Sequence, residues 1–421
     1  MKSRSWAPLV RCSVIALAVI VTTASFWILN QTPSTIVNAQ NGLGGPLSGL
    51  TPLETNMFNQ GFNPFNKFWD PEQGIGPVFT QKNCTACHAS PVPGGGSPGN
   101  TKKDTLFATV NTDGSFNPLT SEGGILLQTR SVSSFIPHCT LPGEVIPSDA
   151  TLIDKRLAPQ AFGMGLIDSI PDSAIQAQAT LEQQNQTFGI AGVPNMVVNE
   201  NHNTVVGKFG YKAEGADLLQ FIGLALTGEI GITNPIAPNE QLPQGQPIPP
   251  NCAKAPEPND DGSQLLAIFH YLLYLAPNPP PSNPNQNGQN LFNSIGCALC
   301  HLPSYTTGDH VVVLVDWFSG RTIVSRALSS QPVNLYSDLL LHDMGHRMGD
   351  GFVFSQATGN QFRTTPLWGL STRTSYLHDG SASTLDDAIR RHGGEATQVI
   401  NGYTALSPND QGDLIKFINS L

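Results

Sequence analysis

The sequence predicts a mostly α-helical fold with long loops and little β-structure. Apolar residues recur at the spacing of a buried helix face in residues 215–231, 261–277 and 407–421. The chain of 421 residues contains 41 glycines and 34 prolines, which predict many turns around these helices. Residues 310–318, HVVVLVDWF, are rich in β-branched side chains and predict the one clear strand.

The first residues have the pattern of an export signal. Three basic residues precede the apolar run 12–29, and a small-residue site follows before Gln40. This pattern predicts a signal peptide over residues 1–39. The apolar run is also long enough to stay uncleaved as an inner-membrane anchor, which is the alternative. Either way, the rest of the chain is expected outside the cytoplasm, in the periplasm.

The middle of the chain alternates between loops and helices. Residues 89–160 are rich in Gly, Ser, Pro and Thr and predict mostly loops. Two helices are expected over residues 215–231 and 261–277, the second ending at Pro277. His270 lies within that second helix, where we expect a packed core residue.

The second half begins with a linker and ends with two helices. Residues 278–290 are rich in Pro and Asn and predict a linker. A helix capped by Ser383 or Thr384 is expected to end at Gly393-Gly394. Ser407 is expected to cap the last helix.

Two short motifs carry the strongest chemical information. NCTACHAS and NSIGCALCHLPSY each contain Cys-x-x-Cys-His. This pentapeptide attaches c-type haem, because the two sulfurs form thioethers and the adjacent imidazole ligates the iron. Zinc clips are the alternative, but the two copies lie far apart and neither has a nearby partner pair. The residues predicted to hold two covalent haems are Cys84, Cys87, His88, Cys297, Cys300 and His301.

The two motifs also predict two domains. A haem motif followed by a later amphipathic helix is the plan of a small cytochrome, and each half of the chain contains it once. We therefore expect an N-terminal cytochrome c-like domain with loop insertions over residues 40–277. A C-terminal one is expected over residues 291–421.

Two further cysteines remain for the body of the chain. Of seven cysteines, Cys12 lies in the export segment and four lie in the haem motifs. Cys139 and Cys252 are expected to form a disulfide in an oxidising compartment. Two buried free thiols are the alternative.

His392 is the best candidate for a second axial ligand to a haem iron. Leu385, Ala388, Ile389 and His392 fall on one face of the expected helix, so the imidazole is aimed at whatever the helix covers. A histidine near a helix C-terminus can instead cap the helix, which the helix dipole favours. Both interpretations stay open from these residues alone.

A peroxide-reducing site also needs an acid–base group to move a proton. Glu229 ends the helix expected over residues 215–231 on an otherwise apolar turn, and it is the most suggestive carboxylate. A solvated glutamate at a helix end is the alternative.

Longer stretches resemble a known family. RLAPQAFGMGLIDSIPD, LLLHDMGH and SYLHDGSASTLDDAIRRHGGEA together resemble the di-haem oxidoreductases, which are related to bacterial di-haem cytochrome c peroxidases. The resemblance implies that the first haem reacts with peroxide and the second relays electrons. It also implies a distal relay ligand fourteen residues after His378, which is His392.

The resemblance also implies two catalytic residues and a possible calcium site. Allowing a one-residue gap, Gln220 and Glu229 fall near the active-site Gln and Glu of the related peroxidases. Those enzymes also carry a distal His on the first haem, which DKRLAPQ lacks. They bind calcium through an Asn at the position of Leu157, and this replacement weakens the expectation of calcium here.

We therefore predict an exported di-haem c-type oxidoreductase that reduces peroxide at the first haem with electrons relayed through the second. The expected donor is a small redox protein, a cytochrome or a cupredoxin. The alternatives are a non-enzymatic di-haem electron-transfer cytochrome and a di-haem oxygenase or protein-modifying oxidase. The net charge of −10 argues against nucleic acid, and a membrane is expected only if the N-terminal segment is uncleaved.

Overall fold

The structure, a computed structural model, describes residues 42–100, 103–252 and 255–421. The expected signal peptide (1–39) and the alternative anchor (12–29) lie outside these residues. Among the helices that the structure does describe, we find none with the length and apolar character needed to cross a membrane.

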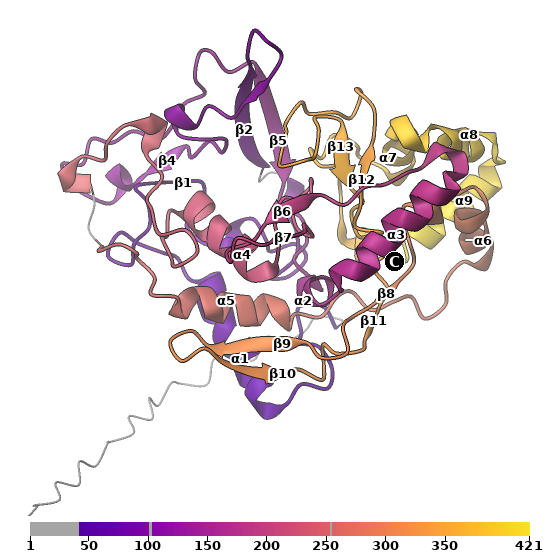
Figure 1. Cartoon of the computed structure of the whole chain (residues 1–421), viewed down its shortest axis with the longest axis horizontal. Coiled ribbons are helices and arrows are strands. Elements are labelled where there is room, and N and C mark those ends of the chain that lie inside the picture. The colour runs from indigo at the N-terminus through magenta and orange to yellow at the C-terminus, as the bar shows by residue number, and fades with distance from the viewer. Residues whose placement is uncertain (1–41, 101–102, 253–254) are drawn as a thin grey trace, which may run out of the picture. The chain divides into compact units, whose positions relative to one another are not determined.

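The fold combines short helices with small sheets (Figure 1). The helices are α1 (Pro52–Asn66), α2 (Met164–Asp168), α3 (Asp172–Asn185), α4 (Leu218–Ala225), α5 (Ser263–Leu273), α6 (Gln286–Ser294), α7 (Leu385–Arg391), α8 (Thr397–Ala405) and α9 (Pro408–Ile418). The strands are β1 (Val78–Phe79), β2 (Lys103–Val110), β3 (Phe116–Asn117), β4 (Arg130–Ser131), β5 (Leu152–Leu157), β6 (Met196–Val198), β7 (Thr204–Val206), β8 (Tyr305–Thr306), β9 (Val312–Asp316), β10 (Arg321–Val324), β11 (Pro332–Val333), β12 (Leu341–Asp343) and β13 (Gln361–Arg363).

The prediction of a mostly α-helical fold is right only in part. Helices contain 33% of the residues and strands 15%, so the fold is a mixture of α and β with small sheets only. Each sheet formed by the described residues has two or three strands. The helical part was predicted from periodicity, whereas most strands are too short to show an alternating pattern.

The clearest correction concerns residues 89–160, which were predicted to be mostly loops. They contain an antiparallel sheet in the order β3-β2-β5. In its longest pairing, Lys103 lies opposite Leu157 and Ala108 opposite Leu152. Pairing satisfies the backbone amides and carbonyls of this polar segment, which would otherwise depend on water.

Helices α1 and α5 pack closely and form the centre of the largest hydrophobic cluster. A capping box starts α1, in which the Thr51 backbone amide donates to the Glu54 carboxylate at 2.7 Å. Gly61 lets the two helices touch, since a Cβ there would lie 2.0 Å from the carbonyl oxygen of Ala267. His270 is only 5% exposed, which confirms the prediction of a packed core residue.

The predicted strand over residues 310–318 is confirmed as β9, which forms a hairpin with β10. The hairpin lies against α5 and α1: His270 Nε2 is 2.7 Å from the Leu314 carbonyl oxygen, and Ser325 donates to Glu54 at 2.5 Å. Val313 and Leu328 belong to the same hydrophobic cluster as α1 and α5. The largest core thus includes residues from both sides of the segment 278–290, and the predicted domain boundaries stay a prediction.

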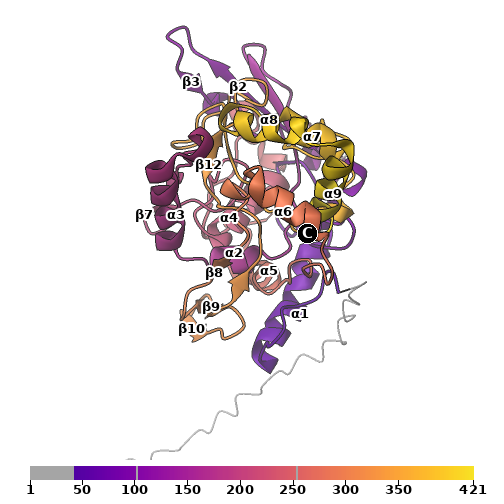
Figure 2. The ribbon, with the colours of Figure 1, turned by 90° about the vertical axis from the view of Figure 1, so that its right-hand side faces the viewer.

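Helices α6, α7, α8 and α9 gather around a second hydrophobic cluster (Figures 1 and 2). Tyr403 and Leu414 are fully buried in it. Thr384 caps α7 by accepting from the Asp387 amide, and Ser407 caps α9 by accepting from the Asp410 amide. Both predicted caps are confirmed.

A disulfide joins Cys139 to Cys252, as predicted. We expect alkylation of the denatured, unreduced protein to leave both cysteines unlabelled. Reduction should lower the free energy of unfolding by about 2–5 kcal/mol, because the bond closes a long loop in the unfolded chain. Denaturant titration with and without reductant measures this loss, and Cys139→Ser should reproduce it. Labelling of both cysteines without reductant would contradict the prediction.

Candidate functional site

The second Cys-x-x-Cys-His motif follows α6 directly. Cys297 begins a 3₁₀ turn, and neither it nor Cys300 forms a disulfide. His301 Nδ1 lies 3.0 Å from the Tyr336 carbonyl oxygen, while Nε2 has no hydrogen bond among the described residues. Burial lowers the pKa of His301 to about 4, so the imidazole is neutral. A neutral ring oriented through Nδ1 is the arrangement of a metal-ligating histidine.

His392 lines the same cavity as His301. Both residues line this cavity of about 220 Å³, whose other walls are mostly apolar. His392 Nδ1 is 2.8 Å from the Ala388 carbonyl oxygen at the end of α7, and burial lowers the pKa of the ring. The imidazole therefore contacts the helix end and lines the cavity at once. Nε2 is left without a hydrogen bond among the residues that the structure describes.

Two arginines give the same cavity a positive edge. Arg363 and Arg373 line it, and neither has a carboxylate within ion-pair distance in the described parts of the chain. Burial lowers the pKa of Arg363 to about 10 and lowers that of Arg373, yet both stay charged at neutral pH. A flat apolar group with two carboxylates complements these walls. The cavity therefore fits a haem held by Cys297, Cys300 and His301.

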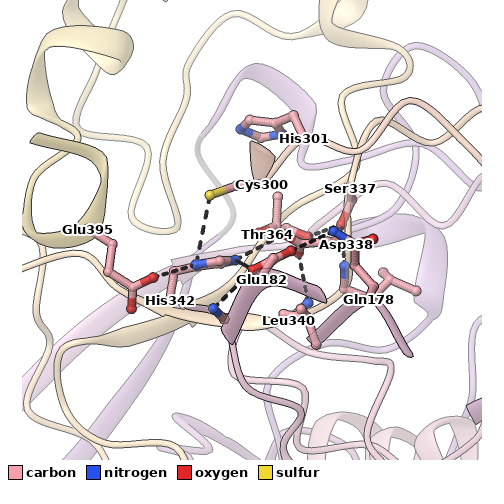
Figure 3. Close-up of polar contacts among 12 residues, drawn as sticks. Gln178, Glu182, Cys300, His301, Ser337, Asp338, Leu340, His342, Thr364 and Glu395 are labelled. Atoms are coloured by element: carbon pink, nitrogen blue, oxygen red, sulfur yellow. Dashed lines mark hydrogen bonds and ion pairs between the residues drawn. The ribbon is translucent and has the colours of Figure 1, made fainter. Parts of the chain in front are cut away.

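A buried cluster of acids surrounds His342 next to this motif (Figure 3). His342 Nε2 is 2.9 Å from Asp338, and its Nδ1 is 2.8 Å from Glu395 and 3.8 Å from the Cys300 sulfur. Burial opposes a charge on the ring, but the Asp338 carboxylate raises the pKa of His342 well above its usual range. Burial, assisted by Asp338, raises the pKa of Glu182 to about 7.

This cluster also contacts the backbone of the second motif. The Asp338 amide donates to the Cys300 carbonyl at 2.9 Å. Cys300, Asp338 and His342 lie close enough together to hold a metal ion, but Cys300 already belongs to the haem motif. The neighbouring Asp and Gly suggest a loop for His342, but the residue lies on β12 and is only 2% exposed.

The first motif has a similar local geometry. Cys84 begins a 3₁₀ turn that Asn83 caps, and neither Cys84 nor Cys87 is in a disulfide. His88 Nδ1 lies 3.0 Å from the Pro159 carbonyl oxygen, and burial lowers the pKa of the ring. This orientation, together with two cysteines that are in no disulfide, fits a second haem.

Glu229 lies beside the first motif. It is part of a π-helical turn (Leu226–Ile230) that extends α4, and its carbonyl accepts from the Thr80 amide at 2.8 Å. Thr80 Oγ1 also donates to the Glu229 carboxylate at 2.5 Å. Burial raises the pKa of the Cys84 thiol to about 12, and the charge of Glu229 contributes to that shift. Glu229 is therefore a near neighbour of Cys84.

Asp104 on β2 forms a carboxyl pair with Glu229. The two side chains share a hydrogen bond. Burial, assisted by the Asp104 charge, raises the pKa of Glu229 to about 8, and burial raises the pKa of Asp104 to about 6. Burial and mutual repulsion thus favour one proton shared by the pair at neutral pH. The sequence showed no sign of Asp104, which lies in a segment predicted to be a loop.

The structure does not bring Gln220 to this pair. Gln220 lies in the first turn of α4, whereas Glu229 follows the last. Its side chain accepts from the Ala216 amide at 3.2 Å and donates to the Val198 carbonyl at 3.2 Å. A catalytic role for Gln220 stays a prediction.

Two buried cations occupy the region where calcium was considered. Lys212 Nζ contacts Asp350 and the Thr358 and Gln361 carbonyl oxygens, each at 2.9 Å. Arg156 binds the other oxygen of Asp350 at 2.6 Å. Asp154, Asp350 and His378 lie close enough together for a metal ion, but Asp350 is already paired with two protein cations. Calcium binding stays a prediction with little support from these contacts.

Residues 144–249 and 278–421, more than half of the chain, match the model of the family described as "Di-haem oxidoreductase, putative peroxidase". The chain belongs to this family. The family name supports haem as the cofactor and oxidation–reduction as the class of activity.

Two other comparisons add little to the family match. A hydrazine synthase structure from Kuenenia stuttgartiensis aligns over 99% of this chain and 100% of its own, with 15% identity and a TM-score of 0.35. A similarity of this size carries no argument about fold or function. A comparison with curated proteins found no match.

Proposed function

We propose that this di-haem oxidoreductase is exported to the periplasm and reduces peroxide. Hydrogen peroxide takes up two electrons and two protons and leaves as two water molecules. The electrons come one at a time from a small reduced redox protein, a cytochrome or a cupredoxin, which is oxidised. Cys297, Cys300 and His301 would hold one haem and Cys84, Cys87 and His88 the other; when bound, the first would supply an electron relay and the second a site for peroxide reduction.

The observation that carries this proposal is the carboxyl pair beside Cys84. Peroxide reduction needs a group that delivers and takes up protons close to the reacting oxygens. Glu229 holds a proton at neutral pH because burial and Asp104 raise its pKa to about 8. Thr80 fixes the carboxyl through a 2.5 Å hydrogen bond. A titratable group that is buried and oriented in this way suits proton transfer better than a solvated helix end does.

The second motif suits a relay. His301 and His392 face one apolar cavity with neutral imidazoles, and both are oriented through Nδ1. Two nitrogen ligands on one iron favour electron transfer over reaction with a small oxidant. We propose that these two residues hold the relay iron and that His88 holds the other.

The holoprotein with a reduced small cytochrome tests the activity. We expect cytochrome oxidation that depends on peroxide and saturates with it. The haem on His88 should be high-spin in at least one oxidation state, since a reactive iron needs an open position. No turnover, together with low-spin spectra at both irons, would contradict the proposal and favour an electron carrier.

Covalent haem is a separate prediction. Protein matured in a bacterial periplasm should show the mass of two added haems, which should resist extraction with acidified acetone because thioethers do not dissociate. Cys297→Ser with Cys300→Ser should lose one haem and keep the other. Intact mass spectrometry measures the stoichiometry. Bare polypeptide with bound zinc would contradict this prediction.

A further inference from the structure

A wall shared by two cavities lies between the haem motifs. Besides the cavity lined by His301 and His392, a smaller polar cavity of about 30 Å³ lies nearby. Tyr211, Arg373 and Leu377 line both cavities. Arg373 is the residue of this wall that carries a full charge.

The smaller cavity belongs to the neighbourhood of the first motif. Ser90 lines it and lies two residues after His88. Ala158 and Gln160 also line it, and they flank Pro159, whose carbonyl oxygen orients the His88 ring at 3.0 Å. The cavity is therefore next to the segment that would hold the first haem.

The smaller cavity is lined by groups that can donate to an anion, and also by Gln160, whose Oε1 has no hydrogen-bond partner among the described residues. Arg373 has no carboxylate within ion-pair distance in the described parts of the chain. Ser375 is only 7% exposed, and its hydroxyl has no hydrogen-bond partner among the residues that the structure describes. A buried hydroxyl without a partner costs free energy unless an acceptor reaches it, and a guanidinium with no carboxylate beside it attracts an anion. A carboxylate can accept from both groups.

We propose that Arg373 is shared between the two haems: its guanidinium binds a propionate of the haem on Cys297 and Cys300 and, through the smaller cavity, a propionate of the haem on Cys84 and Cys87. Ser375 donates to the second of these carboxylates. The inference rests on the proposed presence of two haems. Arg373 is then a positioning residue, and its single positive charge acts on the potentials of both irons.

Midpoint potentials of the two haems test this assignment, because a nearby positive charge favours the reduced state. Arg373→Gln should lower both potentials. Arg363 lines only the larger cavity, so Arg363→Gln should lower only the potential of the haem on His301. Ser375 lines only the smaller cavity, so Ser375→Ala should lower only that of the haem on His88. Spectroelectrochemical titration resolves the two irons in the holoprotein.

Arg373→Lys keeps the positive charge, so both potentials should lie close to those of the parent. This variant is the one to measure if Arg373→Gln loses haem. A shift of only one potential in Arg373→Gln would overturn the inference, and so would a shift of only one potential in Arg373→Lys. These potentials are measured without peroxide, so a parent that shows the predicted pattern without turnover contradicts only the peroxidase proposal. If the parent protein does not contain two covalent haems, intact mass spectrometry shows this before any potential is measured, and the premise of this inference is then wrong.

Discussion

Glu229→Gln should slow peroxide turnover by about two to four orders of magnitude, the usual scale for losing a positioned acid–base group. Glutamine has the size of the native side chain and can keep the contact with Thr80, but it cannot hold or release the proton. Both haem spectra should stay nearly unchanged, because Glu229 is not an iron ligand in the proposed site. Stopped-flow measurement of peroxide reduction by the holoprotein gives the rate. Turnover as fast as that of the parent would reduce Glu229 to a structural side chain.

The pH dependence of the parent follows from the same residue. Burial and Asp104 raise the pKa of Glu229 to about 8, so the proton is present below this pH and lost as the pH rises through it. Peroxide turnover should therefore decline above about pH 8. Asp104→Asn removes the neighbouring negative charge, which should lower the pKa of Glu229 and shift the decline to lower pH. An unchanged profile in Asp104→Asn would show that the pair does not set the proton affinity.

His392→Ala should convert the haem on His301 from a six-coordinate low-spin species to a high-spin or water-bound one. The potential of that haem should rise, because a strong nitrogen donor stabilises the ferric state. The haem on His88 should keep its spectrum, since the described structure places His392 at the other cavity. Absorption and electron paramagnetic resonance spectra of the oxidised and half-reduced protein measure both effects.

Met344→Leu is the matched control for His392→Ala, because Met344 lines the same cavity and offers a sulfur that could ligate iron. It should leave the low-spin spectrum in place. If Met344→Leu changes the spectrum and His392→Ala does not, the methionine is the ligand. The histidine would then only bind the Ala388 carbonyl at the end of α7.

Helices were predictable where periodicity and caps agreed. Helices α4, α5 and α9 have unbroken apolar faces, and α7 and α9 begin at the expected caps. Helix α1 was missed because Asn residues, Gly61 and Pro64 interrupt its apolar face. The pattern Thr51-x-x-Glu54 was the signal that could have located it, since this capping box marks a helix start. The short strands are set by pairing with distant partners, which no local pattern records.

The same division between local and distant information holds for the site. The Cys-x-x-Cys-His motifs are contiguous pentapeptides, so they can be recognised in the sequence, and haem attachment by them stays a prediction. Glu229 was suggested by its apolar surroundings, but its contact with Asp104 joins segments that are far apart in the sequence. The carboxylates around His342 also come from distant segments, including α3 and the turn after α7. Arg373 showed no sequence pattern, because its importance lies in which cavities it separates.

The hairpin β9–β10 has a consequence for how the polypeptide matures. Its residue Val313 packs in the same core as α1 and α5. The core around the first haem motif is therefore incomplete until the hairpin has been synthesised and has packed against these helices. A chain that emerges from its N-terminus would therefore present Cys84 and Cys87 before their final surroundings have formed. That interval would leave both thiols accessible for the proposed attachment of haem, and the last third of the sequence would then complete the core around them.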